Sequence, residues 1–342
     1  MLVPDARAGA TVADIGERAL IDRLRARVGA PPAWIVAGIG DDGALVEPER
    51  GALDVVTADG LIEDVHFRRA WTTARAIGAK AVAVSFSDLA AMGARPRAVV
   101  LSLALPPALP IAEFDNLVAG VIAEAEAEGA ALVGGNLARS PGPLVVDVTA
   151  LGSVRRRRAL RRSGGRPGDE LYVTGSLGAA AAGLAMLAAS AADAAPDAAS
   201  RECLDRYHRP QARVRCGRLV AASRSASAAI DLSDGLAEAA RRLSEASGTG
   251  VAIDALAVPV HPGARVWSGR MGRDAVVDAV AGGEDYELLF AVPPRRRRGF
   301  LAAVARAGGL ACTPVGRLER EPGAWLVRPA GREPLPAGFA HY

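Results

Sequence analysis

The spacing of apolar residues predicts helices and strands that alternate along the chain. A capping Thr11 followed by apolar residues at helical spacing predicts a helix over 11–29. An apolar face from Ile111 to Ala125 predicts another helix, which Gly129 ends. The remaining elements expected in this half are a helix over 72–92 and strands at 35–40, 54–60, 98–104, 131–135 and 144–154.

An abrupt change in composition separates the two halves of the chain. The segment 155–168 is rich in arginine and glycine, and we place the domain boundary there, giving domains 1–155 and 156–342. Beyond it the alternation restarts, with strands expected at 170–174, 228–231, 251–254, 286–292 and 325–327, and helices at 177–189, 211–222, from 234, and 295–307. The pattern therefore predicts two domains that mix helices and strands, an α/β to α+β fold class.

Composition narrows the class of protein. The chain has 342 residues, of which 50% are hydrophobic and 23% charged, which is enough for two packed domains. A net charge of +3 argues against a protein that coats nucleic acid. No run of about 20 apolar residues would span a membrane, so we expect a soluble, cytoplasmic protein. The three cysteines are widely spaced and indicate neither a zinc site nor a disulfide framework.

Lysine usage excludes two common nucleotide sites. Lys80 is the only lysine in the chain, and its neighbours Gly78 and Ala81 do not form a P-loop. The motifs of protein kinases are also absent from the sequence. If the protein binds a nucleotide, it uses neither route.

Aspartates follow several predicted elements closely. They lie in the segments Gly38–Asp42, Thr57–Gly60, Ser85–Leu89 and Asp231–Gly235. Aspartates gathered at one rim of a sheet repel one another unless cations lie between them, and ligands made only of oxygen favour Mg²⁺. The alternative is that these aspartates cap helices and fill turns.

Three further features have open interpretations. The glycine pairs at 134–135 and 282–283 would let backbone N–H groups approach a phosphate, or would simply form turns. The arginines at 155–158, with Arg161 and Arg162, suit a solvated linker, an anionic ligand or, least of all, nucleic acid. His66 is either a structural histidine or a residue that faces the site.

Five motifs in order closely resemble the thiamine-monophosphate kinase family. They are Gly38–Asp42, Thr57–Phe67, Ser87–Pro96, Asp231–Leu236 and Gly282–Leu288, and the resemblance runs from about residue 12 to the end. It implies the fold shared with aminoimidazole ribonucleotide synthetase, in which an N-terminal α/β domain dimerises through its sheet and a C-terminal α+β domain follows. It implies a homodimer that uses ATP and several Mg²⁺ ions to phosphorylate thiamine monophosphate to thiamine diphosphate, without nucleic acid or membrane as a partner.

The resemblance also implies roles for individual residues. The expected Mg²⁺ ligands are Asp41, Asp42, Thr57, Asp59, Asp88, Asp231 and Asp234. The expected ATP contacts are Gly135, Asn136, Arg162 and Ser233. The expected contacts to thiamine monophosphate are His66, Glu284 or Asp285, and Phe339. Asn136 departs from the family, in which many members have an aspartate after the glycine pair.

Phosphoryl transfer requires mainly positioning and charge neutralisation, so no covalent nucleophile is expected. We favour direct in-line transfer, and the sequence leaves a phosphoenzyme open. Other members of the superfamily are the nearest alternatives: selenophosphate synthetase would need a cysteine before Cys203, and a hydrogenase-maturation protein would end in cysteine. Aminoimidazole ribonucleotide synthetase is disfavoured only by the residues of the motifs at Asp231–Gly235 and Gly282–Leu288, which favour the kinase. A nucleotide sensor without catalysis and an arginine-rich RNA binder remain as other classes.

Overall fold

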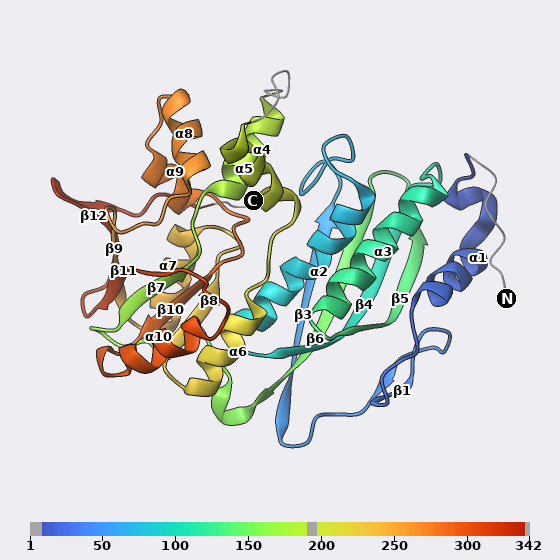
Figure 1. The fold of residues 1–342 in the computed structure, drawn as a ribbon, viewed down its shortest axis with the longest axis horizontal. Helices are drawn as coiled ribbons and strands as arrows, with labels where there is room; N and C mark the ends of the chain where they lie inside the picture. Colours follow the sequence, from blue (N-terminus) through green and yellow to red (C-terminus); the bar gives the residue numbers. More distant parts are fainter. Residues whose placement is uncertain (1–8, 190–196, 339–342) are drawn as a thin grey trace. The chain divides into compact units, whose positions relative to one another are not determined.

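The computed structural model describes residues 9–189 and 197–338. They fall into two units (Figure 1). Unit 1 takes its residues from 1–89 and 96–153, and unit 2 from 90–95 and 154–342. Each unit has its own sheet, so each is described separately.

Unit 1 is built on a four-stranded sheet in the order β3–β6–β4–β5. Its strands are β3 (Ala52–Ile62), β4 (Arg95–Leu105), β5 (Ala131–Arg139) and β6 (Val145–Arg155). Strands β4 and β5 are parallel. Helices α2 (Ala74–Ala91) and α3 (Ile111–Ala127) lie across one face of this sheet (Figure 1).

Two glycines allow α2 and α3 to pack closely. A Cβ atom at Gly78 would lie 2.1 Å from the Leu117 carbonyl oxygen, and one at Gly120 would lie 2.0 Å from the Arg75 carbonyl oxygen. The Ala76 N–H donates to Thr73 Oγ1 at 3.2 Å, so Thr73 supports the start of α2. The close helix pair buries the side of the sheet that α2 and α3 cover.

Helix α1 (Val12–Arg27) lies beside β5 (Figure 1). The Asp14 carboxylate accepts hydrogen bonds from the Thr11 N–H at 2.8 Å and the Thr11 hydroxyl at 2.7 Å, which confirms a helix start at Thr11. Gly16 interrupts the helix with a φ of 74°, a kink that apolar spacing does not reveal.

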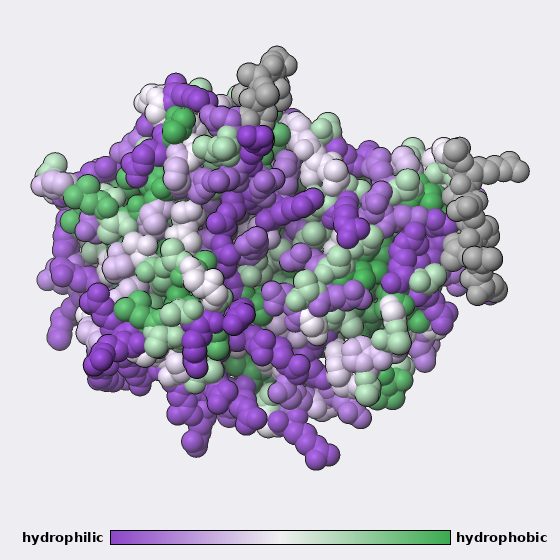
Figure 2. Space-filling view, in the orientation of Figure 1, coloured by the Kyte–Doolittle hydropathy of each residue, from purple (hydrophilic) through white to green (hydrophobic). Residues whose placement is uncertain are grey.

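A small antiparallel pair, β1 (Ile35–Ala37) and β2 (Leu45–Val46), follows α1. Its outer side exposes Val36 and Leu45, at 65% and 61% of their surface. Figure 2 shows hydrophobic atoms over this hairpin at the lower right. The turn between the two strands carries the first aspartate motif.

Unit 2 contains a seven-stranded sheet in the order β13–β12–β9–β11–β7–β10–β8. The strands are β7 (Glu170–Thr174), β8 (Ala228–Asp231), β9 (Gly250–Asp254), β10 (Leu288–Val292), β11 (Cys312–Glu319), β12 (Ala324–Arg328) and β13 (Gly331–Pro334). Five of the six strand pairings in this sheet are antiparallel, and β9 pairs with β12 in parallel. This mixed sheet matches the α+β class expected for the second domain.

The helices of unit 2 surround that sheet. They are α4 (Ala179–Ala188), α5 (Ala198–His208), α6 (Val214–Ser223), α7 (Leu236–Ser247), α8 (Pro262–Arg270), α9 (Ala275–Ala281) and α10 (Arg297–Ala305). The main core lies between one face of the sheet and α4, α7, α8 and α9, where Leu171, Ile253 and Leu289 are fully buried. Phe290 and Phe300 stack edge to face elsewhere in the unit, with ring centroids 5.5 Å apart.

The structure corrects two sequence predictions that bear on the site. Strand β3 continues to Ile62, so Asp59 lies within the strand and not in a turn after it. Gly134, Gly135 and Asn136 lie inside β5, so this glycine pair forms no turn. The sequence reading also omitted α5, α8, α9, β2, β11 and β13.

None of the helices that the structure describes is both long and apolar enough to cross a membrane.

Candidate active site

Two aspartates from different elements meet in unit 1. Asp59 extends from β3 toward α2, where Asp88 lies near the helix end. Burial, and then repulsion by Asp88, raise the pKa of Asp59 to about 6. Two carboxylates held together in this way attract a cation.

The surroundings of this pair leave one oxygen without a partner. Thr57 donates its hydroxyl hydrogen to Asp88 Oδ2, and Ser85 supports Asp59 from α2. Asp59 Oδ2 is buried and accepts no hydrogen bond from the described residues. An unpaired buried carboxylate oxygen is costly, and a bound cation would satisfy it.

The donors around Asp59 are all oxygen atoms, which fits Mg²⁺ better than zinc. In the part of the chain that the structure describes, no three His, Cys, Asp or Glu side chains come together in a way that could hold a metal ion. Within either unit taken alone, the described carboxylates therefore form no preformed three-ligand cluster. Mg²⁺ often binds through only one or two carboxylates, with water and substrate phosphates as its other ligands.

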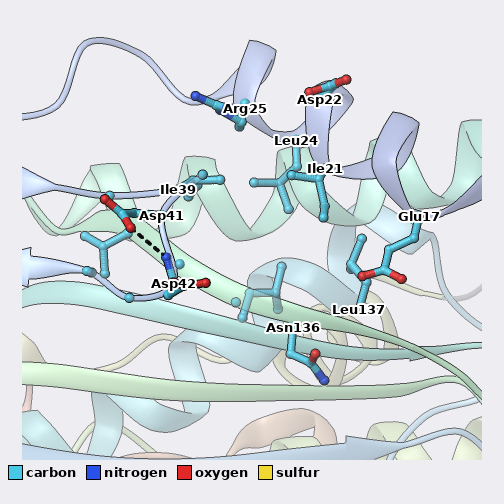
Figure 3. Close-up of a pocket in the computed structure, with 18 of the residues that line it drawn as sticks. Glu17, Ile21, Asp22, Leu24, Arg25, Ile39, Asp41, Asp42, Asn136 and Leu137 are labelled. Carbon is cyan, nitrogen blue, oxygen red and sulfur yellow. Dashed lines mark hydrogen bonds between the residues drawn. The ribbon is translucent and has the colours of Figure 1, made fainter.

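A cavity of about 840 Å³ lies in unit 1 between α1 and the edge of β5. Asp41 and Asp42 line it from the turn after β1, and Gly135 and Asn136 line it from β5 (Figure 3). The Asp42 N–H donates to Asp41 Oδ1 at 2.9 Å, which fixes the turn. The structure thus brings four of the predicted residues to one cavity, although the sequence motifs lie far apart.

Gly135 is required for the strand that borders this cavity. A Cβ at Gly135 would lie 2.0 Å from the Leu101 carbonyl oxygen on β4, whereas one at Gly134 would meet nothing within 4 Å. The glycine pair therefore allows close strand packing at one residue and leaves open space at the other.

His66 closes the turn after β3. The Ile62 N–H donates to His66 Nδ1 at 3.1 Å, and the residue is half-buried. This contact gives His66 a structural role, whether or not it also faces a substrate.

Two motifs of unit 2 pack against each other. The Glu284 N–H donates to the Ser233 carbonyl at 2.7 Å, and the Tyr286 N–H donates to the Leu232 carbonyl at 3.1 Å. A Cβ at Gly283 would lie 2.6 Å from the Ser233 carbonyl oxygen, so glycine is needed there. Two backbone hydrogen bonds and a close backbone approach therefore join the loop after β8 to the loop before β10.

The predicted ligands on the first of these loops have different surroundings. Asp231 ends β8 and is 5% exposed. Asp234 forms an ion pair with Arg242 of α7 at 3.1 Å. A cation at Asp234 would therefore compete with Arg242.

The second loop distinguishes Glu284 from Asp285. Asp285 is buried, and its carboxylate accepts the Gly178 N–H at 2.7 Å at the start of α4. Burial raises the pKa of Asp285 to about 7. Glu284 is half-buried and takes a φ of 67°, a left-handed conformation that is unusual for glutamate.

Glu287 anchors the second loop from inside unit 2. Its side chain is fully buried. It accepts hydrogen bonds from Thr174 Oγ1 at 2.7 Å, Arg213 Nε at 2.7 Å and Arg206 Nη1 at 3.2 Å. Two arginines and a hydroxyl satisfy the buried carboxylate, as such a group requires.

The remaining expected contacts are the arginines around the domain boundary and Phe339. Arg162 and the arginines at 155–158 are exposed, which fits both a solvated linker and a contact to an anionic ligand. Phe339 lies outside the residues that the structure describes.

Sequence reasoning missed the contribution of α1 to the cavity. Glu17, Arg18, Asp22 and Arg25 line it from one side of the helix, while Leu20 and Leu24 are buried. The sequence could have predicted this polar face of α1, because its polar residues recur at helical spacing on the side opposite the apolar residues.

Comparison with known proteins places this arrangement in a family. Residues 40–154 match the family described as AIR synthase related protein, N-terminal domain, and residues 166–326 match AIR synthase related protein, C-terminal domain. Fold and site therefore define a two-domain protein of the AIR synthase related class. Hydrogenase maturation protein HypE shares this fold, with a TM-score of 0.74 at 18% identity.

Closer relatives narrow the class. Thiamine-monophosphate kinase of Mycobacterium tuberculosis is 39% identical over 280 residues, which cover 82% of this chain and 81% of the relative. The crystal structure of thiamine-monophosphate kinase from Stenotrophomonas maltophilia K279a has a TM-score of 0.80 at 39% identity, covering 89% of this chain and 94% of its own. A complex described as AaThiL with AMPPCP and TMP has a TM-score of 0.76 at 30% identity, covering 96% and 98%. The chain belongs to the thiamine-monophosphate kinase family of enzymes.

Proposed function

We propose that this protein transfers the terminal phosphate of ATP to thiamine monophosphate, which forms thiamine diphosphate. The observation that carries the proposal is the buried Asp59 oxygen without a partner beside Asp88, a site for a cation in a fold of this family. A relative with the same fold was solved in complex with AMPPCP and TMP, which supports ATP and thiamine monophosphate as the two substrates.

We assign the Mg²⁺ ligands in two groups. In unit 1 they are Asp41, Asp42, Thr57, Asp59 and Asp88, and in unit 2 they are Asp231 and Asp234. When bound, Mg²⁺ would neutralise phosphate charge and orient the phosphates for transfer. The hydrogen bond from Thr57 occupies Asp88 Oδ2, and the remaining lone pairs of both aspartates would serve the cation.

We assign the nucleotide to the cavity between α1 and β5. Gly135 and Asn136 line it, and the Gly38–Gly43 turn closes one end. In unit 2, Ser233 and Arg162 are also proposed ATP contacts, on the strength of the family motifs alone.

For thiamine monophosphate we favour Glu284 over Asp285. The Asp285 carboxylate is committed to the backbone at the start of α4, so it is a poor candidate for a substrate contact. His66 and Phe339 are the other proposed contacts, on the strength of the family motifs.

The transfer itself is proposed to be direct. An oxygen of the thiamine monophosphate phosphate attacks the terminal phosphorus of ATP, the bridging bond to the β-phosphate breaks, and ADP leaves. The chain's thiols are poor nucleophiles, because burial raises the pKa of Cys203 to about 11 and that of Cys216 to about 12. A cysteine phosphoenzyme is therefore disfavoured on physical grounds.

We also propose a homodimer that forms through the sheet of unit 1, in the cytoplasm. Outward-facing residues of β3 include Val56, which is 64% exposed, on the face that α2 and α3 do not cover. The three cysteines are free, as a reducing compartment favours.

The decisive experiment measures ADP release with purified protein, ATP and Mg²⁺, with and without thiamine monophosphate. We expect ADP and thiamine diphosphate to form together, and only when both substrates are present. Turnover without thiamine monophosphate would point to another member of the superfamily. Nucleotide binding without turnover would indicate a sensor, and RNA binding without nucleotide binding would refute the assignment.

A further inference from the structure

Helix α1 presents two arginines, Arg18 and Arg25, to the cavity. Arg23 and Arg27 both form ion pairs with Asp115 of α3. Arg18 and Arg25 also lie on α1, and both line the cavity. Within residues 9–189 and 197–338, neither Arg18 nor Arg25 forms an ion pair or a side-chain hydrogen bond. Their charges are therefore available to a ligand.

Arg25 lies directly against the aspartate-bearing turn. A Cβ at Gly40 would lie 2.6 Å from Arg25 Cζ and less than 3 Å from both terminal nitrogens, at 2.8 and 2.9 Å. Gly40 also takes a φ of 112°, which side-chain-bearing residues rarely adopt. Glycine at this position thus allows a guanidinium group to rest on the turn beside Asp41 and Asp42.

The cavity has two chemically different ends. Figure 3 shows Arg25 on the side of Ile39, Asp41 and Asp42, and Glu17 on the side of Leu137. Seven residues of helix separate Arg18 from Arg25, a rise of about 10 Å. That distance is comparable to the separation between the base and the terminal phosphates of an extended nucleotide.

Charge decides which end suits the phosphates. The turn at Gly38–Gly43 offers two carboxylates able to hold Mg²⁺, and the Arg25 guanidinium lies against it. The opposite end offers the apolar side chains of Ile21 and Leu137, which suit a base. Lys80 does not line this cavity, so Arg25 and Arg18 are its only basic side chains among the described residues.

We propose that Arg25 binds the terminal phosphates of the nucleotide, in place of the lysine that a P-loop would supply. The inference rests on the proposed function, because it takes the ligand of this cavity to be ATP. A guanidinium group donates two parallel hydrogen bonds to phosphate oxygens and stays charged at any physiological pH. Arg18, at the other end of the same helix face, contacts the nucleoside.

The test compares the affinities of ATP and AMP for four proteins, measured by calorimetry with Mg²⁺ present. The proteins are the wild type, Arg25→Ala, Arg18→Ala and Arg75→Ala. Arg75→Ala is the matched control, because Arg75 is exposed on α2, lies outside the cavity and forms no ion pair or side-chain hydrogen bond with the described residues.

Arg25→Ala should weaken ATP binding by about 10- to 100-fold, the value of a charge-assisted hydrogen-bond pair, and AMP binding by less than about 2-fold. Arg18→Ala should weaken ATP and AMP by the same factor, and Arg75→Ala should weaken neither. Arg25→Lys should recover part of the lost ATP affinity, since lysine restores the positive charge but not the two parallel hydrogen bonds of the guanidinium group. In kinetics, Arg25→Ala should raise KM for ATP and leave KM for thiamine monophosphate unchanged.

Equal losses for ATP and AMP in Arg25→Ala, or the same ATP loss in Arg75→Ala, would overturn the inference. If the wild type phosphorylates thiamine monophosphate while Arg25→Ala binds ATP normally, the inference fails and the proposed function stands. If the wild type binds no ATP, both fail. Thermal unfolding of each variant shows that a lost affinity is not a lost fold.

Discussion

The backbone N–H of Gly178 donates a hydrogen bond to Asp285 Oδ2 at 2.7 Å, across 107 positions of the chain. The Ala180 N–H points at the other carboxylate oxygen, at 3.5 Å. Asp285 therefore serves the first turn of α4, although it neighbours Glu284 in the most recognisable motif of unit 2. The two adjacent acids should respond differently to substitution.

Asp285→Ala should lower the free energy of unfolding by about 1–3 kcal/mol, because it leaves buried N–H groups without an acceptor. Glu284→Gln should leave that free energy within about 0.5 kcal/mol and raise KM for thiamine monophosphate. Urea unfolding and steady-state kinetics on both variants provide the check. A stable Asp285→Ala protein with a raised KM would reverse the two roles.

Asp59 should make the metal-free protein less stable as pH rises. Its pKa is about 6 in the folded chain, above the value of 3.8 expected when unfolded. The folded state therefore holds the proton more tightly, so the stabilising contribution is complete below pH 4 and is lost as pH rises through 6. With chelator present, Asp59→Asn should stabilise the protein at pH 8 by up to about 3 kcal/mol, and by much less at pH 4.

Adding Mg²⁺ at pH 8 should make the wild type more stable than Asp59→Asn, since the bound ion stabilises the wild type and the variant lacks the Asp59 carboxylate that would hold it. Melting temperatures at both pH values, with chelator and with Mg²⁺, test the pair of expectations. If Asp59→Asn were less stable than the wild type at pH 8 in chelator, the Asp59 carboxylate would have a favourable partner in solution.

Asn136→Asp should strengthen the response to Mg²⁺. Asn136 lines the same cavity as Asp41 and Asp42, and an added charge there should lower the half-saturating Mg²⁺ concentration by about an order of magnitude. Initial rates across a Mg²⁺ titration at fixed ATP are the measurement. Coincident curves for the two proteins would show that the side chain at position 136 does not contact Mg²⁺.

Gly135→Ala should disrupt β5, whereas Gly134→Ala should not. The new methyl group at 135 would collide with the Leu101 carbonyl, and the one at 134 would enter open space in the cavity. We expect Gly135→Ala to cost about 1–3 kcal/mol and Gly134→Ala to fold normally while binding ATP less tightly. Equal stability of the two variants would mean that β4 and β5 separate more easily than the structure indicates.

Local sequence predicted the elements better than their ends. Thr11 and Gly129 predicted helix boundaries correctly because capping involves residues only a few positions apart. The end of β3 was misplaced because hydrogen bonding to β6 extends the strand past Asp59, and that pairing is set by a segment far along the chain. The helices α8 and α9 were missed for a related reason: they are short, and packing in unit 2 stabilises them more than their own composition does.

The sequence by itself determined the chemistry that this protein has available: oxygen ligands for a cation, glycine-bearing motifs in a particular order, and one lysine that forms no P-loop. Those properties are covalent and local, and they sufficed to reveal the family. The tertiary structure decided which groups meet. It placed Thr57 beside Asp88, 31 positions away, and Arg25 against Gly40. It also placed the Asp285 carboxylate where it accepts a backbone hydrogen bond at the start of α4. Such contacts depend on how buried apolar faces pack, and packing joins residues that no local pattern connects.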